Sequence, residues 1–320
     1  LRNPTVGGRA VLPLQKGGRV AVVGPHANAT AILVQLDSGM ICPDDTMACV
    51  ESPAAAIRRH NGGGSVVVKQ GHGLFDSATD DNTTVADALA AAAAADVVVL
   101  GAGIAQCAGH GHGVRPEDCW HGYFGAEGTD RTHIDLPPSQ RDFIAQVLAL
   151  NKPTAIFVLN GGSVALAPEL AAPNAAVVEA FYPGAAGAEA LARHLYGDAN
   201  LWGRMPYTMY PAAWVDSHSM LDHDVAATNR TYRYGAPAIV PFGFGLSYSS
   251  WRLRRAAPPA ASAELATDGS SADLNVTLTL TNDGPLAGDA VVMAYLAPRA
   301  TVALQPRPVR SLFDFARARD

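Results

Sequence analysis

No apolar run in this 320-residue sequence approaches the roughly 20 residues that a membrane-spanning helix needs. Basic residues are scarce as well, with 23 lysines and arginines against 29 aspartates and glutamates. The formal charge is −6 and the pI is near 5.9, so the chain has no positive surplus with which to neutralise phosphates. The composition therefore predicts neither a membrane nor a nucleic-acid partner.

Charged residues make up only 16% of the chain, whereas hydrophobic residues make up 48%. This balance is typical of a compact folded protein and not of a disordered one. The length is sufficient for two domains, each with its own core. The turn after the first apolar strand candidate lacks a G-x-G-x-x-G motif, so we expect no nucleotide cofactor there, and nothing else in the sequence indicates a cofactor.

Cysteines number only four, and they fall in two close pairs, Cys42 with Cys49 and Cys107 with Cys119. Neither pair has the CxxC spacing of zinc or redox sites, so local disulfides are the leading interpretation. Four N-glycosylation sequons begin at Asn28, Asn82, Asn229 and Asn275. Together these features favour a secreted, extracellular protein.

Five short apolar runs, rich in valine, have the profile of strands that are buried on both faces. They lie at residues 19–24, 65–70, 96–100, 154–159 and 175–180. Helix candidates alternate with them at residues 52–60, 84–95, 139–150 and 187–196, and we expect Ser139 to cap the third. This alternation predicts an α/β fold over residues 19–210, a mostly parallel sheet with helices on both faces.

The remaining segments differ in character. Residues 1–18 form a lead-in, and residues 211–255 form an ordered connection whose aromatic residues should pack against the sandwich, namely Tyr232, Tyr234, Phe242, Phe244 and Tyr248. Residues 256–320 hold an alternating run at 274–281, an Asn-Asp-Gly turn and a second strand at 289–295. We interpret these strands as a hairpin that begins a β-sandwich. A lone hairpin is marginally stable, so we expect this domain to be truncated.

Residues 125–137 (GAEGTDRTHIDLP) are the polar, turn-prone segment best suited to carry catalytic side chains. They belong to the loop after the strand candidate at 96–100. Ligands of parallel α/β sheets gather beyond the carboxyl ends of the strands, which is where this loop should lie. Glu127 is therefore the leading candidate for an acid/base carboxyl.

Seven motifs in register resemble the C-terminal part of family-3 glycoside hydrolases, closest to the β-xylosidase and β-glucosidase branches. They are VAVVGP at 20–25 after LPL at 12–14, EGTDR at 127–131 with IDLP at 134–137 and Gln140, NGG at 160–162, PG at 183–184 with GDAN at 197–200, GRMP at 203–206, TYRY at 231–234 and PFGFGLSY at 241–248. The resemblance implies a TIM-like barrel, then this α/β sandwich, then a fibronectin-type-III-like domain. It also places the catalytic nucleophile, an aspartate, in the barrel. We find no match to that motif and expect the chain to begin after the barrel.

Retaining glycoside hydrolysis needs two carboxyls about 5–5.5 Å apart, one as nucleophile and one as proton donor. The resemblance implies that the donor comes from this domain, and Glu127 stands at the family's acidic position. Many β-xylosidase-like relatives carry a further acid two residues earlier, where this chain has Gly125. Glu117, in the long loop at 107–124, is therefore the alternative donor. A simpler role for Glu127 is to order its turn by pairing with Arg131.

Three further residues are candidates for substrate binding. Asp130 and Arg131 can bind sugar hydroxyls through charged hydrogen bonds, or they can pin their loop to its own domain. Trp120 can stack on a sugar ring together with Tyr123 and Phe124, or these rings can form a small core for the loop.

Histidines also occur in this loop, at His110, His112 and His121, beside two of the cysteines. A glycine-rich loop binds metal poorly, and a disulfide would remove both sulfurs, so we predict no metal site.

These observations predict part of a retaining, exo-acting β-glycosidase that hydrolyses an oligosaccharide or glycoside together with its own N-terminal barrel domain. The alternative is a non-catalytic homologue that binds carbohydrate or acts as a scaffold. Because the chain lacks the nucleophile, we expect the fragment alone to be inactive.

Overall fold

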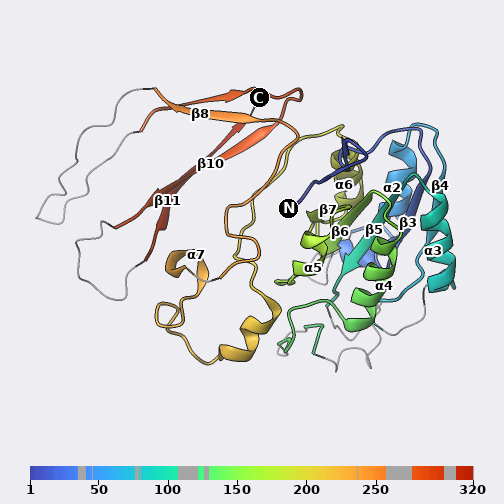
Figure 1. Ribbon diagram of the computed structural model, residues 1–320, viewed down its shortest axis with the longest axis horizontal. Helices are drawn as coiled ribbons and strands as arrows, with labels where there is room; N and C mark the ends of the chain where they lie inside the picture. The colour runs from blue at the N-terminus through green and yellow to red at the C-terminus, as the bar shows by residue number, and fades with distance from the viewer. Residues whose placement is uncertain are drawn as a thin grey trace, which may run out of the picture.

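A five-stranded parallel sheet in the order β4-β3-β5-β6-β7 forms the centre of the protein (Figure 1). Its strands are β3 (Val20–Val23), β4 (Val66–Lys69), β5 (Val97–Gly103), β6 (Thr154–Leu159) and β7 (Ala175–Glu179). The computed structural model describes residues 1–34, 41–44, 46–75, 79, 81–106, 122–125, 130–235, 237–256, 276–298 and 308–319. The predicted α/β fold is confirmed.

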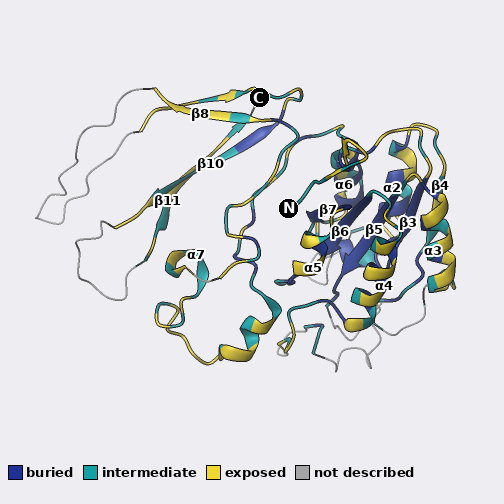
Figure 2. Ribbon diagram, viewed as in Figure 1, coloured by how far each residue is buried: buried dark blue, intermediate teal, exposed yellow. Residues whose placement is uncertain are grey.

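Helices cover both faces of this sheet. On one face lie α1 (Ala31–Val34), α2 (Pro53–His60) and α6 (Gly187–Leu195), and on the other α3 (Val85–Ala94), α4 (Pro138–Ala149) and α5 (Ala167–Ala171). The sheet is the most buried layer, while the helices expose their outer sides (Figure 2). β4 differs from expectation because it is an edge strand, which leaves Val67 46% exposed.

The helix starts follow from local capping chemistry. The Ser52 hydroxyl accepts a hydrogen bond from Ala55 N at 3.3 Å, and Thr84 forms a capping box with Asp87. The prediction that Ser139 caps α4 is wrong. That helix already begins at Pro138, because a proline has a φ angle suited to the first helical position and its missing N–H removes one need for a cap.

The lead-in is more ordered than the sequence predicts. It forms a small hairpin of β1 (Thr5–Val6) and β2 (Arg9–Ala10). Just before the hairpin, Arg2 forms an antiparallel bridge with Val177, so the lead-in extends the central sheet beside β7.

The C-terminal strands form two separate antiparallel pairs. β8 (Trp251–Arg255) pairs with β9 (Leu278–Asn282), and β10 (Asp289–Leu296) pairs with β11 (Ser311–Arg319). The predicted hairpin of the second and third of these strands is therefore wrong. The turn between them packs on the connection instead: Ser249 Oγ accepts from Leu286 N at 3.2 Å, and Gly284 lies directly against Ser249.

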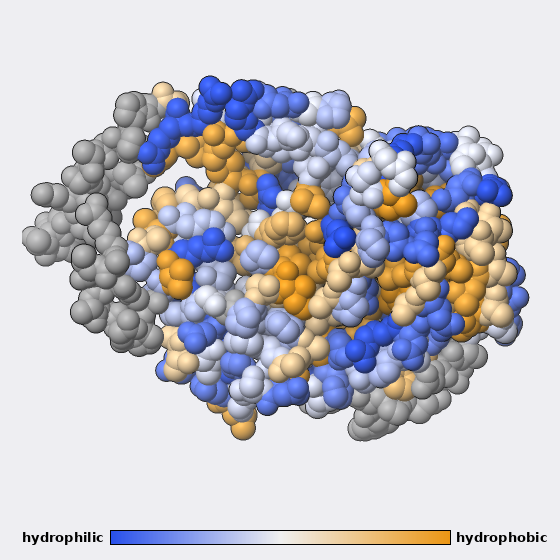
Figure 3. All heavy atoms as spheres, in the orientation of Figure 1, coloured by the Kyte–Doolittle hydropathy of each residue, from blue (hydrophilic) through white to orange (hydrophobic). Residues whose placement is uncertain are grey.

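The connection, which contains η3 (Ala212–Ser217) and α7 (Thr231–Tyr234), contacts both neighbours. Tyr248 donates a hydrogen bond to His194 O at 2.7 Å, so it packs on the α/β sandwich as predicted. Tyr232 instead stacks on Phe242, with 4.4 Å between ring centroids, and meets Tyr295 of β10 edge-on. Apolar side chains gather in the middle of the face shown in Figure 3, where the connection passes the sandwich.

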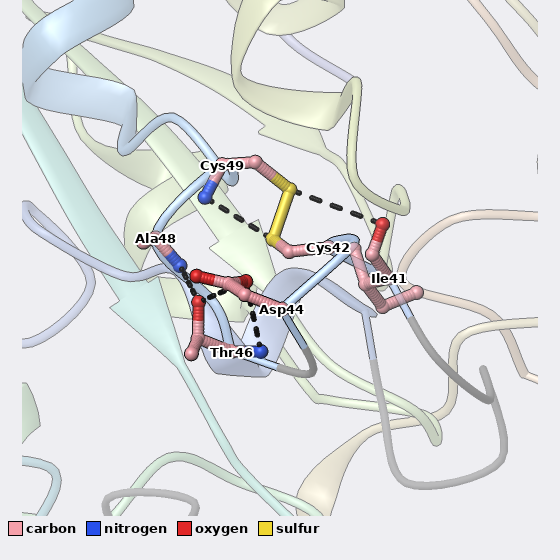
Figure 4. Close-up of a disulfide and its surroundings, with 6 residues drawn as sticks. All are labelled: Ile41, Cys42, Asp44, Thr46, Ala48 and Cys49. Atoms are coloured by element: carbon pink, nitrogen blue, oxygen red, sulfur yellow. Dashed lines mark hydrogen bonds between the residues drawn. A yellow bond between two sulfur atoms is a disulfide. The ribbon is translucent and has the colours of Figure 1, made fainter.

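The predicted disulfide between Cys42 and Cys49 is present in the loop that precedes α2 (Figure 4). Cys42 is 2% exposed and belongs to the core beneath α1 and α2, so the disulfide ties this loop to the sandwich. The pair Cys107 and Cys119 lies outside the described residues. Within the described part of the chain, no helix has the length and apolar character needed to cross a membrane.

Asn200 joins the sandwich to the C-terminal strands. Its Oδ1 accepts from Ser247 Oγ and Tyr248 N, both at 3.0 Å, and its Nδ2 donates to Ser249 Oγ at 3.3 Å. Its backbone oxygen accepts from Asp289 N at 3.4 Å. The side chain is 3% exposed, so these bonds are shielded from water.

Replacing Asn200 with alanine should lower the free energy of unfolding by about 2–4 kcal/mol, because several buried groups lose their partners together. Thermal and urea denaturation followed by circular dichroism measure the loss. The control is Gln146→Ala, an exposed position on α4, which should change the free energy by less than about 0.5 kcal/mol. Equal effects of the two substitutions would contradict the joining role of Asn200.

Candidate functional site

The carboxyl ends of the five strands meet at one edge of the sheet, where ligand sites of such folds lie. In such sheets a crevice commonly forms where the strand order reverses, here between β3 and β5, but protein atoms occupy this position. His26 N donates to Gly101 O at 3.2 Å, and a Cβ at Gly24 would lie 2.4 Å from the same oxygen. His26 is 1% exposed, and burial lowers its pKa to about 4, so it is neutral at pH 7. Arg131 and the turn at residues 160–163 instead follow β5 and β6.

Gln140 fixes the point at which the long loop leaves β5. Its Oε1 accepts from Gly103 N at 2.8 Å, and its Nε2 donates to Gly103 O at 3.0 Å and to Leu74 O at 3.2 Å. The side chain is fully buried, so its amide takes the place of a neighbouring strand. Gly103 has a φ of +140°, and a Cβ there would lie 2.0 Å from Leu159 O, which excludes any other residue.

The loop returns to the sheet through a second set of contacts. Gly125 forms a parallel bridge with Gln106, and Phe124 is 1% exposed in the core. Gly122 O accepts from the backbone N of Thr132 at 2.9 Å and of His133 at 3.0 Å. Residues 122 and 132 are thereby held together.

The aromatic residues of this region pack on one another. Tyr123 stacks on His133 with 4.6 Å between ring centroids, and Phe75 contacts both Tyr123 and Phe124. Phe124 is thus a core residue and not a sugar-stacking ring. Glu127, Glu117 and Trp120 lie outside the described residues, as do His110, His112 and His121.

Arg131 reaches across to the turn that follows β6. Its Nη2 donates to Ser163 O at 2.7 Å, whereas its Nη1 is buried with no partner among the described residues. Burial lowers the pKa of the guanidinium, while Tyr182 and Tyr207 act in the opposite direction. This contact supports the loop-pinning interpretation of Arg131, and the neighbouring Asp130 is exposed.

The glycines of the turn at 160–163 have packing reasons that the sequence did not reveal. A Cβ at Gly161 would lie 2.3 Å from the Tyr182 ring, and one at Gly162 would lie 2.8 Å from Arg131 Nη2. The fully buried Asn160 closes the turn, because its Nδ2 donates to Gly162 O at 3.0 Å. The side chains of Tyr182 and Arg131 thus pack so closely on the turn that only glycine fits at these two positions.

Glu179, at the end of β7, is a residue that sequence reasoning missed. Both of its carboxylate oxygens are buried, and neither has a hydrogen-bond partner among the described residues. Burial raises the pKa of this carboxyl to about 7, while the nearby Asn160 side chain and the Leu1 α-amine act in the opposite direction. The signal available in the sequence was one acid at the end of an otherwise apolar strand.

Comparison with protein families finds that the model described as the glycosyl hydrolase family 3 C-terminal domain matches residues 1–248. The chain is 34% identical over 204 residues to the exo-1,4-β-xylosidase bxlB of Emericella nidulans, which covers 60% of this chain and 26% of that protein. It is 32% identical over 327 residues to the probable exo-1,4-β-xylosidase bxlB of Aspergillus oryzae, which covers 96% of this chain and 37% of that protein. The chain therefore spans well under half the length of these relatives.

Solved structures give the same picture of the fold. A GH3 exo-β-xylosidase (XlnD) in complex with a xylobiose aziridine activity-based probe aligns with a TM-score of 0.73 and 26% identity, over 96% of this chain and 39% of that one. A β-glucosidase from Listeria innocua in complex with glucose aligns with a TM-score of 0.69 and 22% identity, over 100% of this chain and 40% of that one, which is a likeness of fold.

Glu179→Gln should stabilise the protein at neutral pH and leave it unchanged at acid pH. The folded-state pKa of about 7 lies above the ordinary value of 4.5, so the wild type loses stability as pH rises from 4.5 to 7. The loss reaches about 3 kcal/mol at most. Scanning fluorimetry should therefore show a gain in Tm for the variant that grows over this interval and then levels off.

The contrasting variant is Glu189→Gln. In the wild type, hydrogen bonds to His60 and Arg59 lower the pKa of the Glu189 carboxyl. It should lose stability at pH 7, because the ionised form is the favoured one in the folded state. A gain for Glu179→Gln that does not depend on pH would contradict the assigned ionisation.

Proposed function

The chain belongs to glycosyl hydrolase family 3, and from this premise we propose that it is the C-terminal part of a retaining, exo-acting β-glycosidase of the xylosidase type. In this proposal it supplies the general acid/base, while a barrel domain supplies the nucleophilic aspartate and much of the sugar-binding surface. The substrate is an oligosaccharide or glycoside with a β-linked terminal xylose, and the protein acts in xylan breakdown. Glucose is the alternative sugar, because a probable β-glucosidase I of Aspergillus terreus is 32% identical over 203 residues.

The anchored loop after β5 is the observation that carries the proposal. Gln140 holds its start. Buried Phe124 and the Gly125 bridge hold the residues just before 126–129, and Arg131 holds the residues just after them. The segment at 126–129, with Glu127, lies between the last two anchors in the sequence. A catalytic carboxyl needs such fixed attachment, since a small displacement of a reacting group lowers the reaction rate strongly.

The reaction would proceed in two displacements. In the first, the barrel aspartate attacks the anomeric carbon while the protonated Glu127 gives its proton to the leaving oxygen. In the second, the ionised Glu127 takes a proton from the water that attacks the glycosyl–enzyme bond, and free sugar leaves with retained configuration. Glu117 is the alternative donor for the same two steps.

Secretion is part of the proposal. The described sequon asparagines Asn28, Asn82 and Asn229 are exposed, which N-glycosylation requires. The disulfide between Cys42 and Cys49 suits an oxidising compartment.

The 320-residue chain by itself should not hydrolyse 4-nitrophenyl β-xyloside or β-glucoside, because it supplies only one of the two carboxyls. The measurement is release of nitrophenol by the purified, folded chain, with the protein that includes the barrel as positive control. Robust turnover by the chain alone would refute the proposal that the nucleophile and the acid/base lie in different domains.

In the protein that includes the barrel, Glu127→Ala should reduce turnover of xylobiose by roughly 10²–10⁴-fold. Activity toward 2,4-dinitrophenyl β-xyloside should fall much less, because its leaving group needs no proton, and azide should restore the remaining deficit. Glu117→Ala is the matched comparison and should affect both substrates slightly. If Glu117→Ala gives the strong leaving-group dependence instead, then Glu117 is the donor. If neither variant does, then the non-catalytic alternative gains support.

A further inference from the structure

We propose that His60 is a pH-sensitive clamp, which joins α2 to α6 and to the lead-in while its imidazole carries a proton and loosens when that proton is lost. The two helices lie side by side on the same face of the sheet (Figure 1). The clamp is a property of the α/β sandwich and does not depend on the proposed glycosidase function.

His60 is the last residue of α2, and both of its ring nitrogens face carboxylate oxygens. Nε2 lies 2.9 Å from Glu189 Oε2 on α6, and Nδ1 lies 3.0 Å from Asp198 Oδ2, just beyond that helix. The ring also stacks on Tyr196, with 6.5 Å between the ring centroids, and the side chain is 14% exposed. The imidazole is thus held between two acids and an aromatic ring, with little access to water.

These two partners require the protonated ring. A neutral imidazole has one N–H donor and one acceptor, whereas an imidazolium has two donors. An ionised carboxylate only accepts, so either neutral tautomer of His60 would place its acceptor nitrogen against a carboxylate oxygen. Only the imidazolium can donate to Glu189 and to Asp198 at the same time.

Both carboxyls are ionised at neutral pH. Hydrogen bonds from His60 and Arg59 lower the pKa of Glu189 below its ordinary value of 4.5. Hydrogen bonds from Lys16 and, to a smaller extent, His60 lower the pKa of Asp198 below its ordinary value of 3.8. Neither acid therefore supplies the proton that would let a neutral imidazole accept from it.

A second histidine, His194 on α6, has partners that suit the neutral ring. Its Nδ1 lies 2.7 Å from Ala190 O, which is an acceptor, and its Nε2 lies 3.2 Å from Leu201 N, which is a donor. A neutral imidazole with its hydrogen on Nδ1 satisfies both contacts, whereas protonation of Nε2 would set two N–H groups against each other. His194 is thus a natural control for His60.

The clamp reaches the lead-in through Asp198. Lys16 Nζ donates to Asp198 Oδ1 at 2.7 Å, so this carboxylate bridges the lead-in and the imidazole. The backbone follows the same path: Leu14 N donates to the oxygen of Leu195, the last residue of α6, at 2.7 Å. Gly17 N donates to the oxygen of the residue after α2 at 2.6 Å. The lead-in is therefore bonded to the ends of both helices that His60 joins.

Arg59 is the charged neighbour that opposes a proton on His60. Its Nη1 lies 3.3 Å from His60 Nε2, but its charge is shared by Glu51, whose Oε1 accepts from Arg59 Nε at 3.2 Å, and by Glu189 at 2.7 Å. The contact of His60 Nε2 with Glu189 is the shorter one, so the carboxylate is the closer partner of this nitrogen. Burial raises the pKa of Tyr196, so the stacked ring adds no charge.

The sign of the pH dependence follows from these charges. The imidazolium form is the one that binds both carboxylates, so its stabilising effect is present at acid pH and is lost as the pH rises through the range in which histidines lose their proton, about pH 5–8. The lowered pKa values of Glu189 and Asp198 set the other limit, because their contribution is lost only below pH 4.5 and 3.8. The clamp is therefore strongest near pH 5.

The first test compares the melting temperature of the 320-residue chain with that of His60→Gln between pH 5 and pH 8. Glutamine has one amide group and cannot donate to two separated carboxylates in this geometry. The wild type should exceed the variant by about 2–4 °C at pH 5, the effect of one or two partly shielded ion pairs, and the difference should shrink toward pH 8. In a Glu189→Gln background, the same comparison should give a smaller difference at pH 5.

His194→Gln is the matched control, since it removes a histidine from the neighbouring helix. Its loss in melting temperature should stay constant or grow toward pH 8, because the neutral ring is the form that its partners suit. A difference for His60→Gln that is equal at pH 5 and pH 8 would overturn the clamp. So would the same acid-dependent pattern in both histidine variants.

The second test follows the clamp in the wild-type chain and needs no variant. Hydrogen exchange of the Leu14 and Gly17 amides, corrected for the intrinsic effect of pH, should lose protection by roughly two- to fivefold from pH 5 to pH 8, as expected for the loss of one ion pair. The amide of Val22, in the middle of the sheet, should not change. Nitrogen-15 spectra of His60 should show the ring losing its proton over the same pH interval. Loss of the proton without any change at Leu14 and Gly17 would refute the link to the lead-in.

Discussion

The pairing between Gln140 and the backbone of Gly103 is the constraint on which the candidate site depends. β5 extends beyond β3, since their register ends at the pair Val23 and Leu100, while on the other side β5 still pairs with β6 at Gly103 and Leu159. One edge of the protruding residues is thus without a strand. Buried backbone groups need partners, and His26 N and the Gln140 amide supply them. The long loop begins directly after Gly103, the last residue that these contacts hold.

The regular elements could be predicted because their signals are local. β6 was predicted over its whole extent, since a short, fully apolar run between Pro153 and Asn160 indicates a buried strand. β8 was missed because three of its five residues are arginines, and β11 because Asp314, Arg317 and Arg319 interrupt its apolar pattern. Both strands are largely exposed. Ser139 was misassigned because two prolines before it can start a helix without a side-chain cap.

The candidate site was less predictable, since its contacts join residues that lie far apart in the sequence. The motif around Arg131 predicts that this loop carries the site, but only the fold shows that Arg131 contacts the turn after β6. The two glycines of that turn looked like ordinary turn residues, whereas Tyr182 and Arg131 determine them by close approach. Glu179 belongs to a strand whose other residues are apolar, so no local pattern marks it as a buried carboxyl.

The arrangement of Arg131 bears directly on how a carboxyl nearby in sequence can act as a proton donor. A guanidinium paired with Glu127 would stabilise the ionised form and lower its pKa, whereas an acid catalyst must hold its proton near working pH. Arg131 donates instead to a neutral backbone oxygen, Ser163 O, and its Nη1 is buried. The positive charge of Arg131 therefore lies against the turn at residues 160–163.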